Sequence, residues 1–91
     1  MTIGEFRRMP ASSFDGAVLA LWWEARGNWE KAHEVAQDLD GRDGAWLHAY
    51  LHRREGDRSN ADYWYRRAGK PAETGDLDRE LELMVAELLG R

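Results

Sequence analysis

The sequence contains no cysteine, which excludes disulfide bonds, thiolate metal sites and a cysteine nucleophile. It has only two prolines, and no apolar run approaches the roughly 18 residues that a membrane-spanning helix requires. The segment from Met1 to Ser13 also lacks the apolar core of a secretory signal. We therefore expect a cytoplasmic protein that makes no membrane contact.

An overall excess of positive charge is also missing, because 13 Lys and Arg face 17 Asp and Glu, for a net charge of −4. This balance argues against generic nucleic-acid binding, which relies on the release of counterions from phosphates. The charge is unevenly spread: residues 42–70 hold seven basic and four acidic residues, or +3, and the remainder carries −7. We therefore expect that the basic segment in the middle of the chain could still bind an anionic group.

Signatures of catalysis are absent from the sequence. Ser12, Ser13 and Ser59 lie at positions typical of helix caps, and no glycine-rich phosphate loop follows a strand. Sustained alternation of polar and apolar residues is missing too, and β-branched residues are scarce, which argues against a sheet. We expect neither catalytic residues nor a cofactor.

Large aromatic residues are abundant in this short chain, with five tryptophans, three tyrosines and two phenylalanines among 91 residues. A single domain of this length buries only about 60–65% of its unfolded surface. Each large ring can bury roughly 150–250 Å². We therefore expect the aromatic rings to supply much of a thin core.

Apolar residues recur at helical spacing along most of the chain. Residues 1–11 are expected to form a flexible or loosely docked lead-in, and residues 12–91 a single helical domain. Within this domain we predict helical hairpins at 12–40 and 43–69 and an amphipathic helix at 76–90. Ser12 with Asp15 resembles a capping box for the first helix, and Asp43 is the expected cap of the third.

The sequence contains an internal repeat of the pattern G-[ND]-x-x-x-A. It begins at Gly27-Asn28 and again, 29 residues later, at Gly56-Asp57. Glycine supplies the left-handed position after a helix, and Asn or Asp is a favoured N-cap of the next one. Each copy therefore predicts a tight turn between two helices, so that the two hairpins are built alike.

The two hairpins resemble the tetratricopeptide repeat, a helix-turn-helix unit. The first unit matches through Leu19, Ala20, Trp23, Gly27, Ala32, Ala36 and Leu39. The second matches through His48, Ala49, His52, Gly56, Ala61, Tyr65 and Ala68. The resemblance implies an all-α fold of two hairpins stacked as a right-handed solenoid, with the C-terminal helix covering one end. Alanines at 20, 32, 49 and 61 would let the helices approach closely. Residues 45–69 are also similar to a group of small uncharacterised bacterial proteins. This second resemblance does not point to any particular activity.

A partner-binding surface follows from the same resemblance, because side chains of the first helix of each unit line the groove of tetratricopeptide domains. By position, and with the exposed aromatic Tyr63 added, this surface comprises Leu21, Glu24, Trp46, Tyr50, Arg53, Arg54 and Tyr63. Two guanidinium groups beside aromatic rings suit a peptide with an acidic group. The resulting hypothesis is a non-enzymatic interaction module. Alternatively, the arginines form a solvated face with intrahelical pairs such as Asp62 with Arg66.

The histidines offer a second hypothesis, which is a metal- or small-ligand-binding protein that could also be an enzyme. His48 and His52 lie four residues apart on one helix, and Glu55 falls close to the same face. Two imidazole nitrogens and a carboxylate oxygen suit a divalent metal ion, with Glu24 or His33 as a possible fourth ligand.

A packing role is the alternative for His48 and His52, since they stand where the first unit has Leu19 and Trp23. As half-buried rings they would need hydrogen-bond partners such as Tyr63, Tyr65 or a carboxylate. A structural homodimer formed through aromatic surface is the third function that the sequence leaves open.

Overall fold

The structure is a computed structural model that describes residues 2–90, so Met1 and Arg91, at the outer ends of the expected lead-in and domain, lie outside it. The elements are α1 (Ile3–Arg8), a 3₁₀ turn (Ala11–Ser13), α2 (Gly16–Ala25), α3 (Trp29–Gln37), α4 (Gly41–Arg54), α5 (Arg58–Ala68) and α6 (Leu77–Leu89). No strand occurs among residues 2–90, which confirms the predicted all-α class. Within that range, no helix has both the length and the apolarity needed to cross a bilayer.

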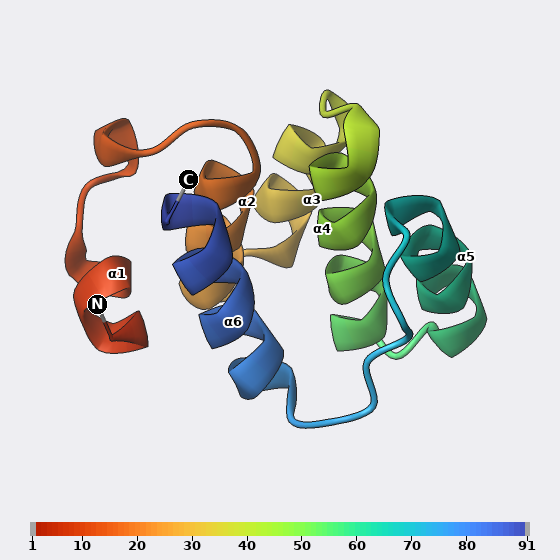
Figure 1. Ribbon diagram of the computed structural model, residues 1–91. Coiled ribbons are helices and arrows are strands. Elements are labelled where there is room, and N and C mark those ends of the chain that lie inside the picture. The colour runs from red at the N-terminus through yellow and green to blue at the C-terminus, as the bar shows by residue number, and fades with distance from the viewer. Residues whose placement is uncertain (1, 91) are drawn as a thin grey trace.

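Helix α4 lies at the centre of the molecule (Figure 1). It packs most extensively against α5 and also contacts α2, α3 and α6. Helix α2 packs mainly against α3, and α1 rests on α2. All residues of α4 from Gly44 to His52 are buried, because neighbouring helices cover this helix on several sides.

The junctions at Gly27 and Gly56 have the same geometry. Both glycines have positive φ, 82° and 89°, a conformation that side chains with a Cβ adopt only at a cost. The next residue caps the following helix in each case: Asn28 accepts from the backbone N–H of Lys31, and Asp57 from that of Asn60. These turns are therefore built as the sequence predicts.

Small and aromatic residues share the core. The four alanines expected at close helix contacts are fully buried, as predicted: Ala20, Ala32, Ala49 and Ala61. Tyr50 and Tyr65 are the largest side chains that are fully buried. Tyr63 is 43% exposed, in line with the exposed position expected for it, and the neighbouring Trp64 is half-buried.

The first eleven residues differ from the expected flexible lead-in, because residues 3–8 form α1 and dock on the domain. Thr2 and Glu5 form a capping box at its start. Phe6 is fully buried and packs against Phe14, with 4.9 Å between ring centroids. Trp22 Nε1 donates to the carbonyl of Met9 at 2.8 Å, which fixes the segment that follows α1.

Two helices begin elsewhere than the sequence predicts. Ser12 lies in the 3₁₀ turn, and the N-cap of α2 is Asp15, three residues later, so that α2 itself starts at Gly16. Between them Phe14 is extended and packs against Phe6 of α1. Helix α4 starts at Gly41 with Asp40 as N-cap, so Asp43, the expected cap, lies in its first turn. The second hairpin thus begins two residues before position 43.

Candidate functional site

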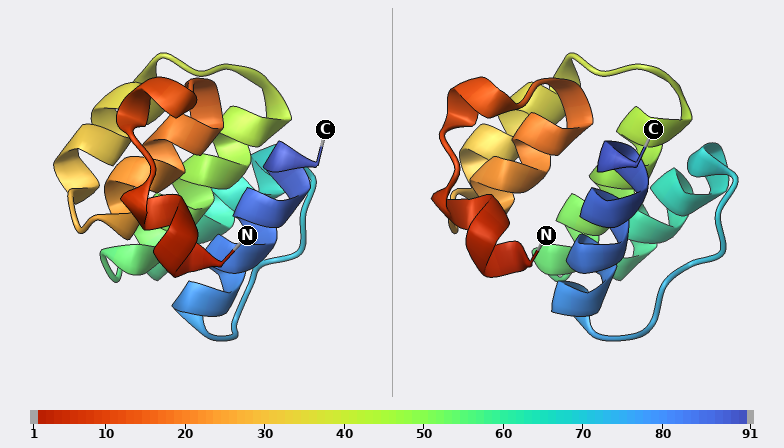
Figure 2. Two further views of the ribbon diagram at one scale, coloured as in Figure 1. Left: turned by 90° about the vertical axis from the view of Figure 1, so that its left-hand side faces the viewer. Right: turned by 60° about the vertical axis from the view of Figure 1, so that its left-hand side comes forward.

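Helix α6 covers the surface that the sequence predicts as a partner-binding groove. It lies across α2 and α4, with α1 beside it (Figure 2). Its apolar face buries Leu81, Met84 and Val85. Helix α6 thus contacts α2 and α4, which are the first helices of the two hairpins.

Arg53 holds a carboxylate of α6 in a buried ion pair. Its Nη1 lies 2.7 Å from Glu80 Oε1, and the two side chains are only 9% and 4% exposed. The hydroxyl of Tyr65 donates to the same carboxylate at 2.6 Å. Burial and the hydrogen bond to Glu80 raise the pKa of Tyr65, so its hydroxyl stays protonated and able to donate. Arg53 also donates to the carbonyl of Gly75, just before α6.

Arg54 links three helices through charged groups. Its Nη2 lies 2.8 Å from Asp78 of α6, and its Nε lies 3.0 Å from Glu24 of α2. The Tyr50 hydroxyl donates to Glu24 at 2.9 Å and accepts from Arg54 Nη2 at 2.8 Å. Burial, together with the charge of Glu24, raises the pKa of Tyr50. The network leaves each of these charged groups with a partner of opposite sign.

The predicted partner-binding residues are therefore not open to a partner in this state. Leu21 is fully buried, and Trp46 is buried with Lys70 Nζ 3.9 Å from its ring centroid. Glu24, Tyr50 and Arg53 are covered by α6, and Arg54 keeps 28% of its side chain exposed. Tyr63 of α5 is the one residue of the predicted set that is exposed, and its hydroxyl accepts a hydrogen bond from Arg67.

The sequence analysis did not predict the roles of Asp78 and Glu80, which pair with Arg54 and Arg53 in this network. Their acidic character is typical of the first turn of a helix, so they look like ordinary favourable charges near the helix N-terminus. The expected pair of Asp62 with Arg66 is also replaced, because Asp62 pairs instead with Arg58 at 3.1 Å.

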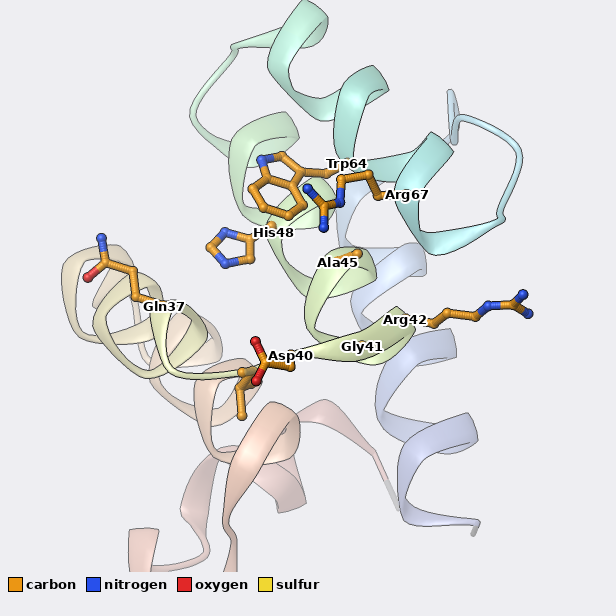
Figure 3. A pocket seen from close by; sticks show the side chains of 9 residues that line it. Gln37, Asp40, Gly41, Arg42, Ala45, His48, Trp64 and Arg67 are labelled. Atoms are coloured by element: carbon orange, nitrogen blue, oxygen red, sulfur yellow. The ribbon is translucent and has the colours of Figure 1, made fainter.

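A cavity of about 360 Å³ lies between the connection from α3 to α4 and helix α5 (Figure 3). Trp64 and Arg67 of α5 border it together with His48 of α4, and Gln37 and Asp40 lie on the opposite side. Its polar lining with charges of both signs does not identify a ligand class.

The three histidines of the chain converge between α3 and α4. His33 comes from α3, and His48 and His52 lie one turn apart on α4. One ring nitrogen of each lies within 4.8 Å of those of the other two. The His33 ring stands edge-on to both others, with centroid distances of 5.5 and 5.6 Å. His33, considered from sequence only as an additional ligand, is thus a full member of this histidine cluster.

Glu55 and Glu24 take other places than the metal hypothesis gave them. Glu55 does not join His48; it accepts a hydrogen bond from His52 Nδ1 at 2.6 Å on the outer side of the ring. Glu24 is bound to Tyr50 and Arg54 in the network under α6.

Each histidine ring is held by a neighbouring group. His33 stacks on Trp29, with 4.8 Å between centroids and 9° between planes. His48 stacks on Trp64 at 4.3 Å, and its Nε2 lies 3.1 Å from the carbonyl of Ala36. The Nδ1 of His48 is buried without a hydrogen-bond partner. The tyrosines expected to satisfy these rings bond elsewhere, Tyr65 to Glu80 and Tyr63 to Arg67.

No family model matches this chain, and no curated protein or solved structure matches it either. Two features of the described residues bear on function: the charged network under α6 and the histidine cluster.

Proposed function

We propose that this chain is a non-enzymatic interaction module whose two hairpins stack as in tetratricopeptide domains. Its groove between α2 and α4 takes an amphipathic helix with acidic residues in the first turn, and in the free chain α6 is that helix. The pairing of Arg53 with Glu80 and of Arg54 with Asp78 is the observation that supports this proposal most directly.

The chemistry of the groove defines the class of partner. Arg53 is almost fully buried, so a helix that displaced α6 without bringing a carboxylate would leave its charge unpaired at a cost of several kcal/mol. The incoming helix must also bring apolar side chains to replace Leu81, Met84 and Val85. The groove therefore selects for an acidic start and an apolar stripe together, and against a merely hydrophobic helix.

The resident helix sets the strength that a partner needs. Only residues 69–76 connect α5 to α6. A flexible linker of this length gives its helix an effective concentration in the millimolar range. A helix from a separate partner molecule must therefore compete with α6 at this effective concentration. The observed affinity for the partner is lower than the intrinsic affinity by a factor equal to the fraction of chains whose groove is open.

The first prediction uses a fluorescent peptide of residues 76–90 as the incoming helix. In the full-length chain, Glu80→Gln weakens α6 and leaves Arg53 in place to receive the peptide. We expect this variant to bind the peptide at least about tenfold more tightly than the wild-type chain, in fluorescence anisotropy, since each 1.4 kcal/mol changes affinity tenfold.

Two controls make this experiment decisive. Glu82→Gln, on the exposed side of α6, should leave the affinity of the chain for the peptide at the wild-type value. A peptide that itself carries the Glu80→Gln change should bind poorly to every chain. Equal binding of both peptides, or no gain in the Glu80→Gln chain, would remove the proposal. Light scattering on the same samples tests whether a second copy supplies the helix.

A further inference from the structure

We propose that His33, His48 and His52 form a binding site for one divalent transition-metal ion, with Zn²⁺ as the leading candidate. The site lies between α3 and α4 and is separate from the groove under α6. It therefore goes beyond the interaction function and does not depend on it. The chain has three histidines, and all of them belong to this cluster.

The hydrogen bonds leave ring nitrogens available to a metal ion. A carbonyl only accepts, so His48 Nε2 must carry the proton that it donates to Ala36, which leaves Nδ1 to offer a lone pair. In the same way His52 Nδ1 donates to Glu55, and Nε2 is left. His33 makes no hydrogen bond among the described residues, so either of its nitrogens can serve. Neutral imidazole is the form that binds metals.

Hydrogen bonds from the ring nitrogens that face away from the ion hold the rings, as they do in established metal sites. Metal-binding histidines almost always donate their other N–H to a backbone carbonyl or a carboxylate, and here Ala36 and Glu55 accept from His48 and His52. Trp29 fixes His33 by stacking, and its indole N–H is itself anchored on the carbonyl of Leu51 at 2.8 Å. The rings are therefore oriented before any ion arrives.

The buried Nδ1 of His48 is the observation that packing alone does not explain. His48 is 7% exposed, and this nitrogen has neither solvent nor a protein donor beside it. Buried polar atoms are nearly always satisfied, because leaving one without a partner costs about 1–3 kcal/mol. A coordinated metal ion would satisfy it.

The spacing of the rings requires only a small adjustment. Zinc–nitrogen bonds of about 2.0–2.1 Å place the nitrogens of a tetrahedral site about 3.3 Å apart. One nitrogen of each ring lies within 4.8 Å of one nitrogen of each of the other two. Movements of the ring nitrogens by about 1.5 Å would bring such a trio to the spacing of a tetrahedral site.

The donor set indicates the kind of ion. Imidazole nitrogens suit Zn²⁺, Cu²⁺, Ni²⁺ and Co²⁺, whereas Mg²⁺ and Ca²⁺ prefer oxygen ligands. Three protein ligands leave the fourth tetrahedral position for water or a small ligand. A second group, His52 with Glu55 and Asp57, offers two carboxylates, but Asp57 already caps α5 and Glu55 already holds His52.

The test uses full-length protein purified without a histidine tag. We expect Co²⁺ to bind at one ion per chain and to give visible absorption typical of a tetrahedral site. Zn²⁺ should displace it and should raise the melting temperature, because an ion that binds only the folded state stabilises that state. A chelator should reverse both effects.

Three variants separate this site from adventitious binding. His33→Phe keeps the stacking on Trp29 but removes the nitrogen, so the Co²⁺ band and the zinc-dependent melting shift should both disappear. Glu55→Gln keeps all three ligands and should weaken binding by about 10–100-fold. Glu34→Gln, exposed on the same helix as His33, should bind as the wild type does.

The proposal fails if the wild-type chain shows neither the Co²⁺ band nor a melting shift with stoichiometric Zn²⁺. It fails equally if His33→Phe binds within a few-fold of the wild type, since His48 and His52 alone would then account for the binding. A His33→Phe chain that melts at the wild-type temperature without metal shows that loss of binding is not loss of folding.

Discussion

Tyr65 is fully buried, yet its hydroxyl reaches a charged partner, because Glu80 enters the core from α6. The sequence puts Tyr65 at helical spacing from Ala61 and Ala68, and all three residues are buried. It gives no hint of Glu80, which lies 15 residues away across a linker. Helical periodicity tells which face a residue occupies, but the partner on that face depends on how distant helices are arranged.

A second prediction, at the same scale, is that Tyr65→Phe lowers the free energy of unfolding by about 1.5–3 kcal/mol. The ring remains packed, but Glu80 loses a short hydrogen bond, and bonds to charged groups are worth about that much. Urea denaturation followed by tryptophan fluorescence measures the change. Tyr63→Phe removes the same hydroxyl from an exposed ring and should stay within about 0.5 kcal/mol of the wild type.

The histidine cluster also depends on contacts between distant helices. The sequence places His48 and His52 on one face of a helix, and the packing alternative expected them to be half-buried, whereas both are buried. It offered His33 only as one of two candidates for a fourth ligand, because placing His33 beside the other two requires the packing of α3 on α4. The rare use of histidine, only three in the chain, is the one sequence signal that could have grouped them.

At the scale of elements, the local signals of the two glycine turns were read correctly, whereas the caps of α2 and α4 were not. The Gly27-Asn28 and Gly56-Asp57 turns follow from glycine conformation and capping alone. Helix α1 was missed because its stability comes from burying Phe6 against Phe14, a contact that no local pattern reports. The start of α4 was placed late, because Asp40 and Asp43 are equally plausible caps from sequence.

The third prediction concerns the connection of α3 to α4. A Cβ at Gly44 would lie 2.7 Å from the backbone carbonyl oxygen of Leu39, so the connection would have to shift. We expect Gly44→Ala to destabilise the protein by about 1–3 kcal/mol. In α1, a Cβ at Gly4 meets nothing closer than 3.8 Å, so Gly4→Ala should instead stabilise it by up to about 1 kcal/mol. Thermal unfolding of the two variants should move in opposite directions.

The molecule as a whole departs from the sequence-based view in one main respect. The sequence places α6 over an exposed end of the hairpins, whereas it lies on α2 and α4 and pairs with Arg53 and Arg54. Those arginines were expected to receive an acidic group of a partner. They instead bind Glu80 and Asp78 of the chain itself. These two carboxylates belong to the acidic first turn of α6, whose charge is opposite to that of the basic middle of the sequence.

The pair of Arg53 with Glu80 joins α4 to α6, the helix that we propose fills the groove, so its coupling energy tests the central claim most directly. A double-mutant cycle with Arg53→Gln, Glu80→Gln and the double variant, measured by urea denaturation, isolates that energy. If α6 occupies the groove as described, we expect the two side chains to be coupled by about 1–3 kcal/mol. Effects of the two substitutions that simply add, with no coupling, would contradict it.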